Sequence, residues 1–191
     1  MAFQLIAGHP ALDFVNTLDW RFGSRGPQEL LASYDDLVRF VQQSKLLGHR
    51  PRASRSTGAR VLKRSIELRE ALAEVFYARL DGRTPSSEAR HTVERYFKEA
   101  RLRQTLDWKQ ARLEWKWRAQ AASAELPFWV LALCAEDLMT SEAAGRVRAC
   151  DNAECRWLFL DTSKNHTRRW CDMKLCGNRM KARRFKIRRN A

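Results

Sequence analysis

The feature of this sequence that most constrains its fold is a group of four cysteines within 27 residues. They are Cys150, Cys155, Cys171 and Cys176, so that two Cys-x4-Cys pairs are separated by fifteen residues. Two close pairs with a longer loop between them are typical of a four-thiolate zinc site, in which each pair holds one side of a tetrahedral ion. We therefore predict one structural zinc ion bound by these four cysteines.

Two disulfides in a small secreted module would also use four cysteines. The start of the chain does not resemble a secretory signal, because its first basic residue is Arg21 and Asp13 interrupts the early apolar stretch. Cytosolic thiols stay reduced, which favours the zinc site and a cytoplasmic protein. A closed four-thiolate site offers no position to water, so we expect the metal to hold the fold and not to hydrolyse a substrate.

The part of the chain before the cysteines is predicted to be mostly helical. Between its last two helices, Leu113, Trp115 and Trp117 alternate with charged residues, which predicts an antiparallel β-hairpin turning near Lys109-Gln110. The longest nearly apolar run has ten residues, whereas a membrane span needs about 20, so we predict no membrane partner. Apolar periodicity and capping signals place the helices over residues 11–18, 33–47, 58–80, 84–100 and 125–140.

The cysteine-containing part follows a different pattern. A short strand over residues 147–149, the first cysteine pair, a second strand over 157–161, a turn-rich loop and a helix from Asn178 follow one another. This order is typical of a treble-clef-like zinc finger. We therefore predict an α+β protein with a mostly helical domain over residues 1–141, which includes the hairpin, and a small treble-clef-like finger over residues 142–191 that ends in a basic helix. Because the helical domain has its own apolar faces, we expect it to stay folded when the finger loses its metal.

The positive charge of the chain is concentrated at its end. The net charge is +14, and residues 163–191 hold eleven Lys and Arg against one acid, Asp172. Such a run indicates a polyanionic partner, which is nucleic acid or an anionic membrane surface, and the terminal helix has too thin an apolar face for a membrane. A solvated or partner-binding helix is the alternative. We expect phosphate contacts from the cations beyond the last ligand, which are Arg183, Arg184, Lys186, Arg188 and Arg189, with Lys181 as a weaker candidate. We expect Arg156, Arg169 and Arg179, the arginines nearest the cysteines in sequence, to offset the charge of the thiolates.

Two stretches of the chain resemble known families. The segment RVRACDNAECRWLFLDTSKNHTRRWCDMKLCGNR resembles the CGNR-type zinc finger, which is named for its last four residues, here Cys176 to Arg179. The N-terminal ALDFVNTLDW resembles the opening of the ABATE domain, which usually accompanies this finger in bacterial proteins. Arg156 stands where the finger family commonly has glycine, and Lys164 where arginine is common. The family is described as stress-induced transcription regulators, so the resemblance implies binding of DNA, most simply duplex DNA.

Three classes of function are therefore compared. The first is a DNA-binding transcription regulator whose finger and basic tail contact DNA, while the N-terminal domain senses a signal or forms a homodimer. The second is an RNA- or protein-binding adaptor in which zinc is purely structural. The third is an enzyme using His9, Asp13 and Asn16, but the sequence contains no nucleophile motif, phosphate loop or metalloenzyme motif, so we predict no enzyme. Instead, Asp13 and Asn16 are predicted to form a buried, hydrogen-bonded cluster, beside which a pocket for a small-molecule effector could open.

Overall fold

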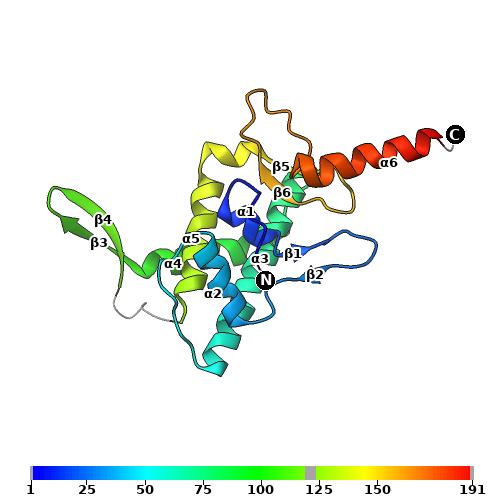
Figure 1. The fold of residues 1–191 in the computed structure, drawn as a ribbon. Coiled ribbons are helices and arrows are strands. Elements are labelled where there is room, and N and C mark those ends of the chain that lie inside the picture. Colours follow the sequence, from blue (N-terminus) through cyan, green and yellow to red (C-terminus); the bar gives the residue numbers. More distant parts are fainter. Residues whose placement is uncertain (1, 119–123, 190–191) are drawn as a thin grey trace.

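Six α-helices and three small hairpins make up the part of the chain that the structure describes (Figure 1). The structure is a computed structural model, and it describes residues 2–118 and 124–189. In chain order the elements are α1 (Pro10–Val15), β1 (Leu18–Asp19), β2 (Gln28–Glu29), α2 (Tyr34–Gln43), α3 (Arg55–Leu80), α4 (Ser87–Leu102), β3 (Gln104–Lys109), β4 (Arg112–Trp117), α5 (Leu126–Thr140), the 3-10 helix η2 (Glu142–Arg146), β5 (Val147–Ala149), β6 (Leu158–Leu160), the π-helical turn η3 (Met173–Gly177) and α6 (Asn178–Arg189).

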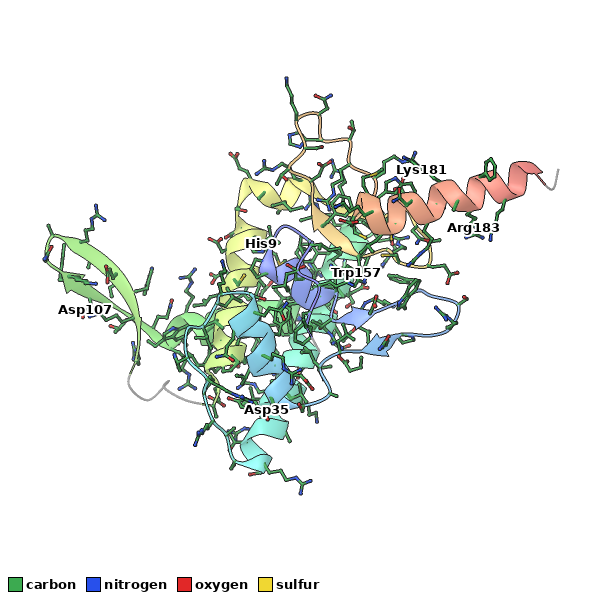
Figure 2. All side chains as sticks on the ribbon, in the orientation of Figure 1. His9, Asp35, Asp107, Trp157, Lys181 and Arg183 are labelled. Carbon is green, nitrogen blue, oxygen red and sulfur yellow. The ribbon has the colours of Figure 1, made fainter. Side chains whose placement is uncertain are left out.

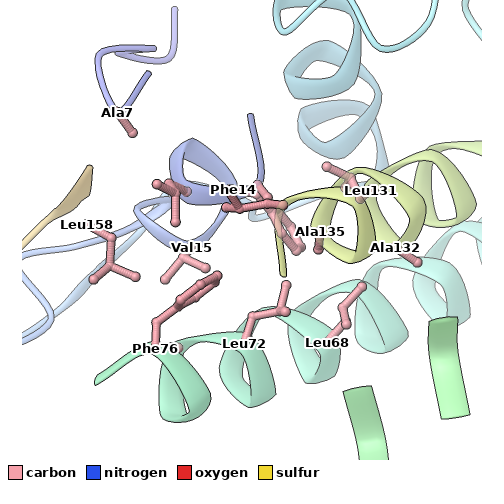
Figure 3. Packing of buried hydrophobic residues seen from close by; sticks show 14 of the residues in the cluster. Ala7, Phe14, Val15, Leu68, Leu72, Phe76, Leu131, Ala132, Ala135 and Leu158 are labelled. Atoms are coloured by element: carbon pink, nitrogen blue, oxygen red, sulfur yellow. The ribbon is translucent and has the colours of Figure 1, made fainter. Parts of the chain in front are cut away.

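The helix α5 lies at the centre of the helical body. Its first ten residues, Leu126 to Ala135, are all apolar, and the helix contacts α1, α2, α3 and α4. Figure 3 shows Ala132 and Ala135 of α5 on the side of Leu68 and Leu72 of α3, and all four side chains are buried. A helical segment that is apolar on every side must be covered on every side, which explains why the other helices surround it. Among the described residues, no helix has both the length and the apolar content that crossing a bilayer requires.

Capping residues decide where the helices begin. Ser33 caps α2 as predicted, and its side chain accepts a hydrogen bond from the amide of Asp36. The helix α2 ends at Gln43, earlier than expected, because Lys45 takes a left-handed backbone conformation with φ of 59°. The predicted start of α4 at Thr84 is two residues early, since Ser86 provides the cap.

Each of the three sheets is one antiparallel hairpin. The predicted β-hairpin is confirmed as β3–β4, which turns at Gln110 with a φ of 55°. In Figure 1 this hairpin and α6 project from the helical body in different directions. The other two hairpins lie against the body, where β1–β2 and β5–β6 bring loops next to the cysteines.

One buried cation fixes β1–β2 to α3. Arg69 of α3 is 1% exposed. Its guanidinium donates two hydrogen bonds of 2.7 Å to the carboxylate of Glu29, one of 2.8 Å to Glu70 and one of 3.1 Å to the hydroxyl of Thr17. The two carboxylates balance its charge, as a buried ion requires. This network sets the direction in which the β1–β2 loop leaves the body.

The buried polar cluster predicted around Asp13 and Asn16 is confirmed, and it joins the two ends of the chain. The side-chain amide of Asn16 donates to the carbonyl of Leu158 and accepts from its amide, both at 2.9 Å. The amide of Leu160 donates to the carbonyl of Ala7 at 2.7 Å, and the amide of Ala7 donates to the Asp13 carboxylate at 2.9 Å. The N-terminal segment therefore completes the edge of β6 that β5 leaves open.

The cysteine-containing segment shares one hydrophobic core with the helices. Leu158 and Phe159 of β6 are fully buried and belong to the same cluster as α1, α3 and α5. Figure 3 shows Leu158 beside Val15 of α1 and Phe76 of α3. The expectation that the helical part keeps its fold without the finger therefore needs revision, because β6 covers part of the helical core.

Burial raises the pKa of Asp13 to about 6, although the amide of Ala7 donates to its carboxylate. The unfolded value is near 4, so between about pH 4 and 6 the folded chain binds the extra proton and Asp13 makes the fold less stable as the pH rises. The variant D13N keeps an acceptor for Ala7 and removes this titration. We expect its free energy of unfolding, relative to wild type, to rise by about 1 kcal/mol from pH 5 to pH 7, where the thiolates can keep their metal. Urea titrations of the zinc-loaded proteins at each pH measure this, and a pH-independent difference would contradict it.

The variant N16A leaves the amide and the carbonyl of Leu158 buried without partners. Each such group costs about 1–3 kcal/mol, so we expect a loss of roughly 2–5 kcal/mol in the free energy of unfolding. Chemical denaturation followed by circular dichroism measures the loss. The matched control is N165A, which removes an exposed asparagine side chain and should leave stability unchanged. Equal stability of N16A and N165A would contradict the role given to Asn16.

Candidate functional site

The first cysteine pair sits on a tight turn at the end of the β5–β6 hairpin. The amide of Cys150 donates to the carbonyl of Trp157 at 2.9 Å, which closes the turn at its base. Within the turn, the carbonyl of Asn152 accepts from the amides of Cys155 and Arg156, at 2.8 and 2.9 Å. Arg156 then takes a left-handed conformation with φ of 47°. These bonds turn both sulfurs toward the same side of the hairpin.

The second cysteine pair opens the terminal helix. Asp172 caps the turn η3, where its carboxylate accepts from the amide of Leu175 at 2.8 Å. Gly177 follows Cys176 directly, and a Cβ there would lie 2.8 Å from the Sδ of Met173. Glycine at this position lets the Met173 side chain pack against the backbone. The helix α6 starts at the next residue, so the fourth cysteine fixes the base of the basic helix.

The structure brings all four predicted ligands together. The four Sγ atoms lie within 4.8 Å of one another, and all four cysteines are buried. The Sγ atoms of Cys155 and Cys171 are 3.7 Å apart, as are those of Cys171 and Cys176. A tetrahedral ion with Zn–S bonds of about 2.3 Å requires sulfurs about 3.8 Å apart, whereas a disulfide requires about 2 Å. The cluster therefore fits one structural zinc ion, and none of the five cysteines forms a disulfide.

The charge of the cluster also calls for a cation. Without one, hydrogen bonding with Cys150 lowers the pKa of Cys176 and raises the pKa of Cys155, because neighbouring negative charges oppose one another. A divalent ion allows all four to ionise. The fifth cysteine, Cys134, lies on α5 outside the cluster, and burial raises the pKa of its thiol to about 11. Its environment is that of a small apolar side chain.

The donor that supports the sulfurs is an asparagine that the sequence analysis missed. Asn152 is 2% exposed, and its side-chain amide donates to the Sγ of Cys176 at 3.6 Å. Asn152 lies two residues after Cys150, in the turn between the first two ligands, and this position in the sequence could have identified it as a donor to the sulfurs. The three arginines expected in this role make other contacts.

Those arginines connect the finger to its surroundings. Arg156 pairs with Asp81 at 3.0 Å, and Arg169 pairs with Asp151 at 2.5 Å. The guanidinium of Arg179 lies 5.1 Å from the centre of the Trp20 ring. In the part of the chain that the structure describes, these arginines donate no hydrogen bond to a cysteine sulfur, so the expectation that they offset the thiolate charge directly is not supported.

Three further contacts hold the first cysteine turn against the body. The hydroxyl of Tyr77 on α3 donates to the carbonyl of Arg156 at 2.9 Å. The indole of Trp157 donates to Asp19 at 2.8 Å, and Ser24 in the β1–β2 loop donates to Glu154. The finger is therefore tied to α1, to α3 and to the β1–β2 loop, and not only to its own metal.

The loop between the cysteine pairs is organised by Asp161, which is fully buried. Burial opposes its ionisation, but hydrogen bonds from Ser163 and from the amide of Arg168 hold the pKa of Asp161 below its usual range. His166 contacts the carbonyl of Asp161 through Nδ1 at 3.2 Å and is outside the cysteine cluster. The loop thus has a structural role, and its histidine is not one of the metal-site residues.

The helix α6 carries the predicted nucleic-acid contacts. Lys181, Arg183 and Lys186 are exposed, and Figure 2 shows Lys181 and Arg183 on the part of α6 that leaves the body. Arg184, Arg188 and Arg189 belong to the same helix, but their side chains lie outside the described residues. The helix contains no acid between Arg179 and Arg189. The placement is compatible with contact to a polyanion along the whole helix.

The residues proposed for an effector pocket are engaged in internal contacts. Asp13 is 7% exposed and Asn16 is 4% exposed, with the hydrogen bonds described above. A cavity of about 170 Å³ lies beside the cysteine cluster, and its lining includes Asp19, Trp20 and Arg179 but neither Asp13 nor Asn16. Asp13 and Asn16 as part of an effector pocket therefore stay a prediction. Their hydrogen bonds support a structural role.

Comparison with known families gives two matches that together span most of the chain. The model of the ABATE family, described as "Putative stress-induced transcription regulator", matches residues 8–142. The model of the CGNR zinc finger matches residues 146–189. Comparison with individual curated proteins gives no match. Both families are regulator or zinc-finger types and not enzyme families.

Replacing one ligand tests how far the metal supports the fold. The variant C155S should lose zinc, and because β6 covers the helical core, the amides of α1 should lose protection from hydrogen exchange together with those of the finger. Hydrogen exchange by mass spectrometry and zinc analysis measure both effects. The control C134S changes the one cysteine outside the cluster and should keep a full equivalent of zinc. Unchanged protection of α1 in C155S would show that the helical part is independent of the finger.

Proposed function

The chain belongs to the ABATE family, and we propose that it is a zinc-containing, DNA-binding transcription regulator. In this proposal the finger and the basic tail contact duplex DNA, and the helical part senses a signal or forms a homodimer. We assign the protein to the cytoplasm, where thiols stay reduced. We assign no catalysis, because a closed site of four thiolates has no open position for a substrate.

The observation that carries the proposal is the surface of α6. The finger arginines closest to the cysteines have partners within the protein, whereas α6 leaves the body with Lys181, Arg183 and Lys186 exposed (Figure 2). The metal centre holds only the first turn of this helix in place. A basic helix with so thin an apolar face gains little from packing, so a bound polyanion is a natural partner for it.

Six of the seven basic positions of α6 fall on two opposite sides of the helix, and position 189 lies between them. With 3.6 residues per turn, positions 179, 183 and 186 share one side, and positions 181, 184 and 188 share the other. A helix in the major groove of B-DNA has a phosphate backbone on each side, so two basic sides suit this placement. The major groove of duplex RNA is too narrow for a helix, which favours DNA as the polyanion.

Removing the tail cations should abolish binding without unfolding the protein. We expect the variant with alanine at the five main candidates, Arg183, Arg184, Lys186, Arg188 and Arg189, to keep its zinc and its circular dichroism spectrum. If all five contact phosphates, log K against log salt for the wild type has a slope of about −4 to −5, from about −0.9 per phosphate. Fluorescence anisotropy with a duplex at several salt concentrations measures it. Equal slopes for wild type and variant would defeat the proposal and favour the RNA- or protein-binding adaptor.

Smaller variants test the groove geometry. R183A/K186A and R184A/R188A remove cations from opposite sides of α6, and each should reduce the slope by about 2. The matched control K63A/R90A removes two exposed cations from α3 and α4, and its slope should equal that of the wild type. A loss confined to one side of α6 would contradict insertion between two phosphate backbones.

A further inference from the structure

The hairpin β3–β4 has two faces of opposite character. Residues paired across an antiparallel hairpin share a face, and here Leu106 pairs with Trp115 and Trp108 with Leu113. The alternate pairs, Asp107 with Glu114 and Lys109 with Arg112, occupy the other face. The hairpin is therefore an amphipathic ribbon, although it projects from the body (Figure 1).

The apolar face of this ribbon is open to solvent over its outer part. The exposed fractions of the side chains are 50% for Leu106, 67% for Trp108, 51% for Leu113 and 54% for Trp115. The base is fixed, where Trp117 packs against the core and the amide of Arg118 donates to the carbonyl of Arg103 at 2.9 Å. Farther out, the guanidinium of Arg101 on α4 lies 5.7 Å from the centre of the Trp115 ring, which leaves that side chain half exposed. A two-stranded hairpin alone is at best marginally stable in water, and contiguous apolar patches of this kind mark interaction sites.

The chemistry of the two faces limits what can cover the apolar one. On the charged face, Asp107 pairs with Lys116 and Glu114 pairs with Lys109, so that face satisfies its acids internally. The apolar pairs, Leu106–Trp115 and Trp108–Leu113, contain no charged side chain. These pairs therefore offer no cation that could bind the phosphates of a polyanion. A matching partner must itself present an uncharged apolar surface.

We propose that the partner is a second copy of this chain, which packs the apolar face of its own β3–β4 ribbon against this one. The tryptophan is on β4 in the pair Leu106–Trp115 and on β3 in the pair Trp108–Leu113. When two such faces pack about a two-fold axis that runs along or across the strands, each tryptophan of one copy lies against a leucine of the other. The four side chains expose about 500 Å² per copy, or about 1,000 Å² for two, which reaches the area of a specific interface. The dimer leaves α6 of each copy exposed on a different side of the body (Figure 1).

This inference deepens the dimerising role that the proposed function gives to the helical part. It is tested without DNA, so its failure and the failure of DNA binding can be told apart. The full zinc-loaded chain should sediment at about 50 µM with twice its mass of 22.3 kDa. The variant W108E/L113E places two charges on the apolar face and should raise the dimer Kd at least about 100-fold, which gives a monomer.

Two control variants distinguish loss of the apolar contact from the effect of added charge and from unfolding. T105E/Q110E adds the same charge off the apolar face and should stay dimeric. If W108E/L113E loses zinc or helical signal, the uncharged variant W108A decides, with an expected 10- to 100-fold rise in Kd. A monomeric wild type overturns the proposal and leaves the face to another protein. A dimer that resists both apolar-face variants, or one that T105E/Q110E also dissociates, overturns it as well.

Discussion

The hydrogen bonds along the open edge of β6 join the N-terminal segment to the cysteine-containing segment. A three-residue strand with one partner leaves backbone groups unsatisfied, and burying them without partners is costly. Asn16 and Ala7 supply the missing donors and acceptors, and Asp13 holds Ala7 in place. The apolar strand β6 can therefore pack on the helical body only because Asn16, and Asp13 through Ala7, satisfy these backbone groups. The metal centre follows β6 to the same place.

The metal centre in turn has an effect beyond its own loop. Four thiolates fix the first cysteine turn to the start of α6, while Tyr77 and Trp157 fix the same turn to the helical body. The direction of α6 therefore depends on two sets of contacts. One set is the zinc–thiolate bonds, and the other is the contacts of the first cysteine turn with the helical body. A rigid base and a projecting helix are what a protein needs to hold several cations in register with a regular polyanion.

The sequence was informative where local chemistry decides the outcome. Metal-ligand spacing and two-residue alternation identified the cysteine cluster and the β3–β4 hairpin, because both rules act over a few residues. It was uninformative where a partner lies far along the chain. The burial of Arg69 depends on Glu29, and the role of Asn16 depends on Leu158, 142 residues away. Alternation also showed that one face of the hairpin is apolar, but it carries no information about what covers that face.

The separation between Asn16 and Leu158 has a consequence for biosynthesis. The helix α1 leaves the ribosome before β6, and the strand that completes its surroundings follows only about 142 residues later. Until then the apolar surface of α1 and α3 has no cover, and closing so long a loop is slow compared with forming local helices. Capture of the metal by the last cysteines is then the final step that closes a core begun at the N-terminus. Supply of zinc during translation becomes a determinant of how much of this protein reaches its native state.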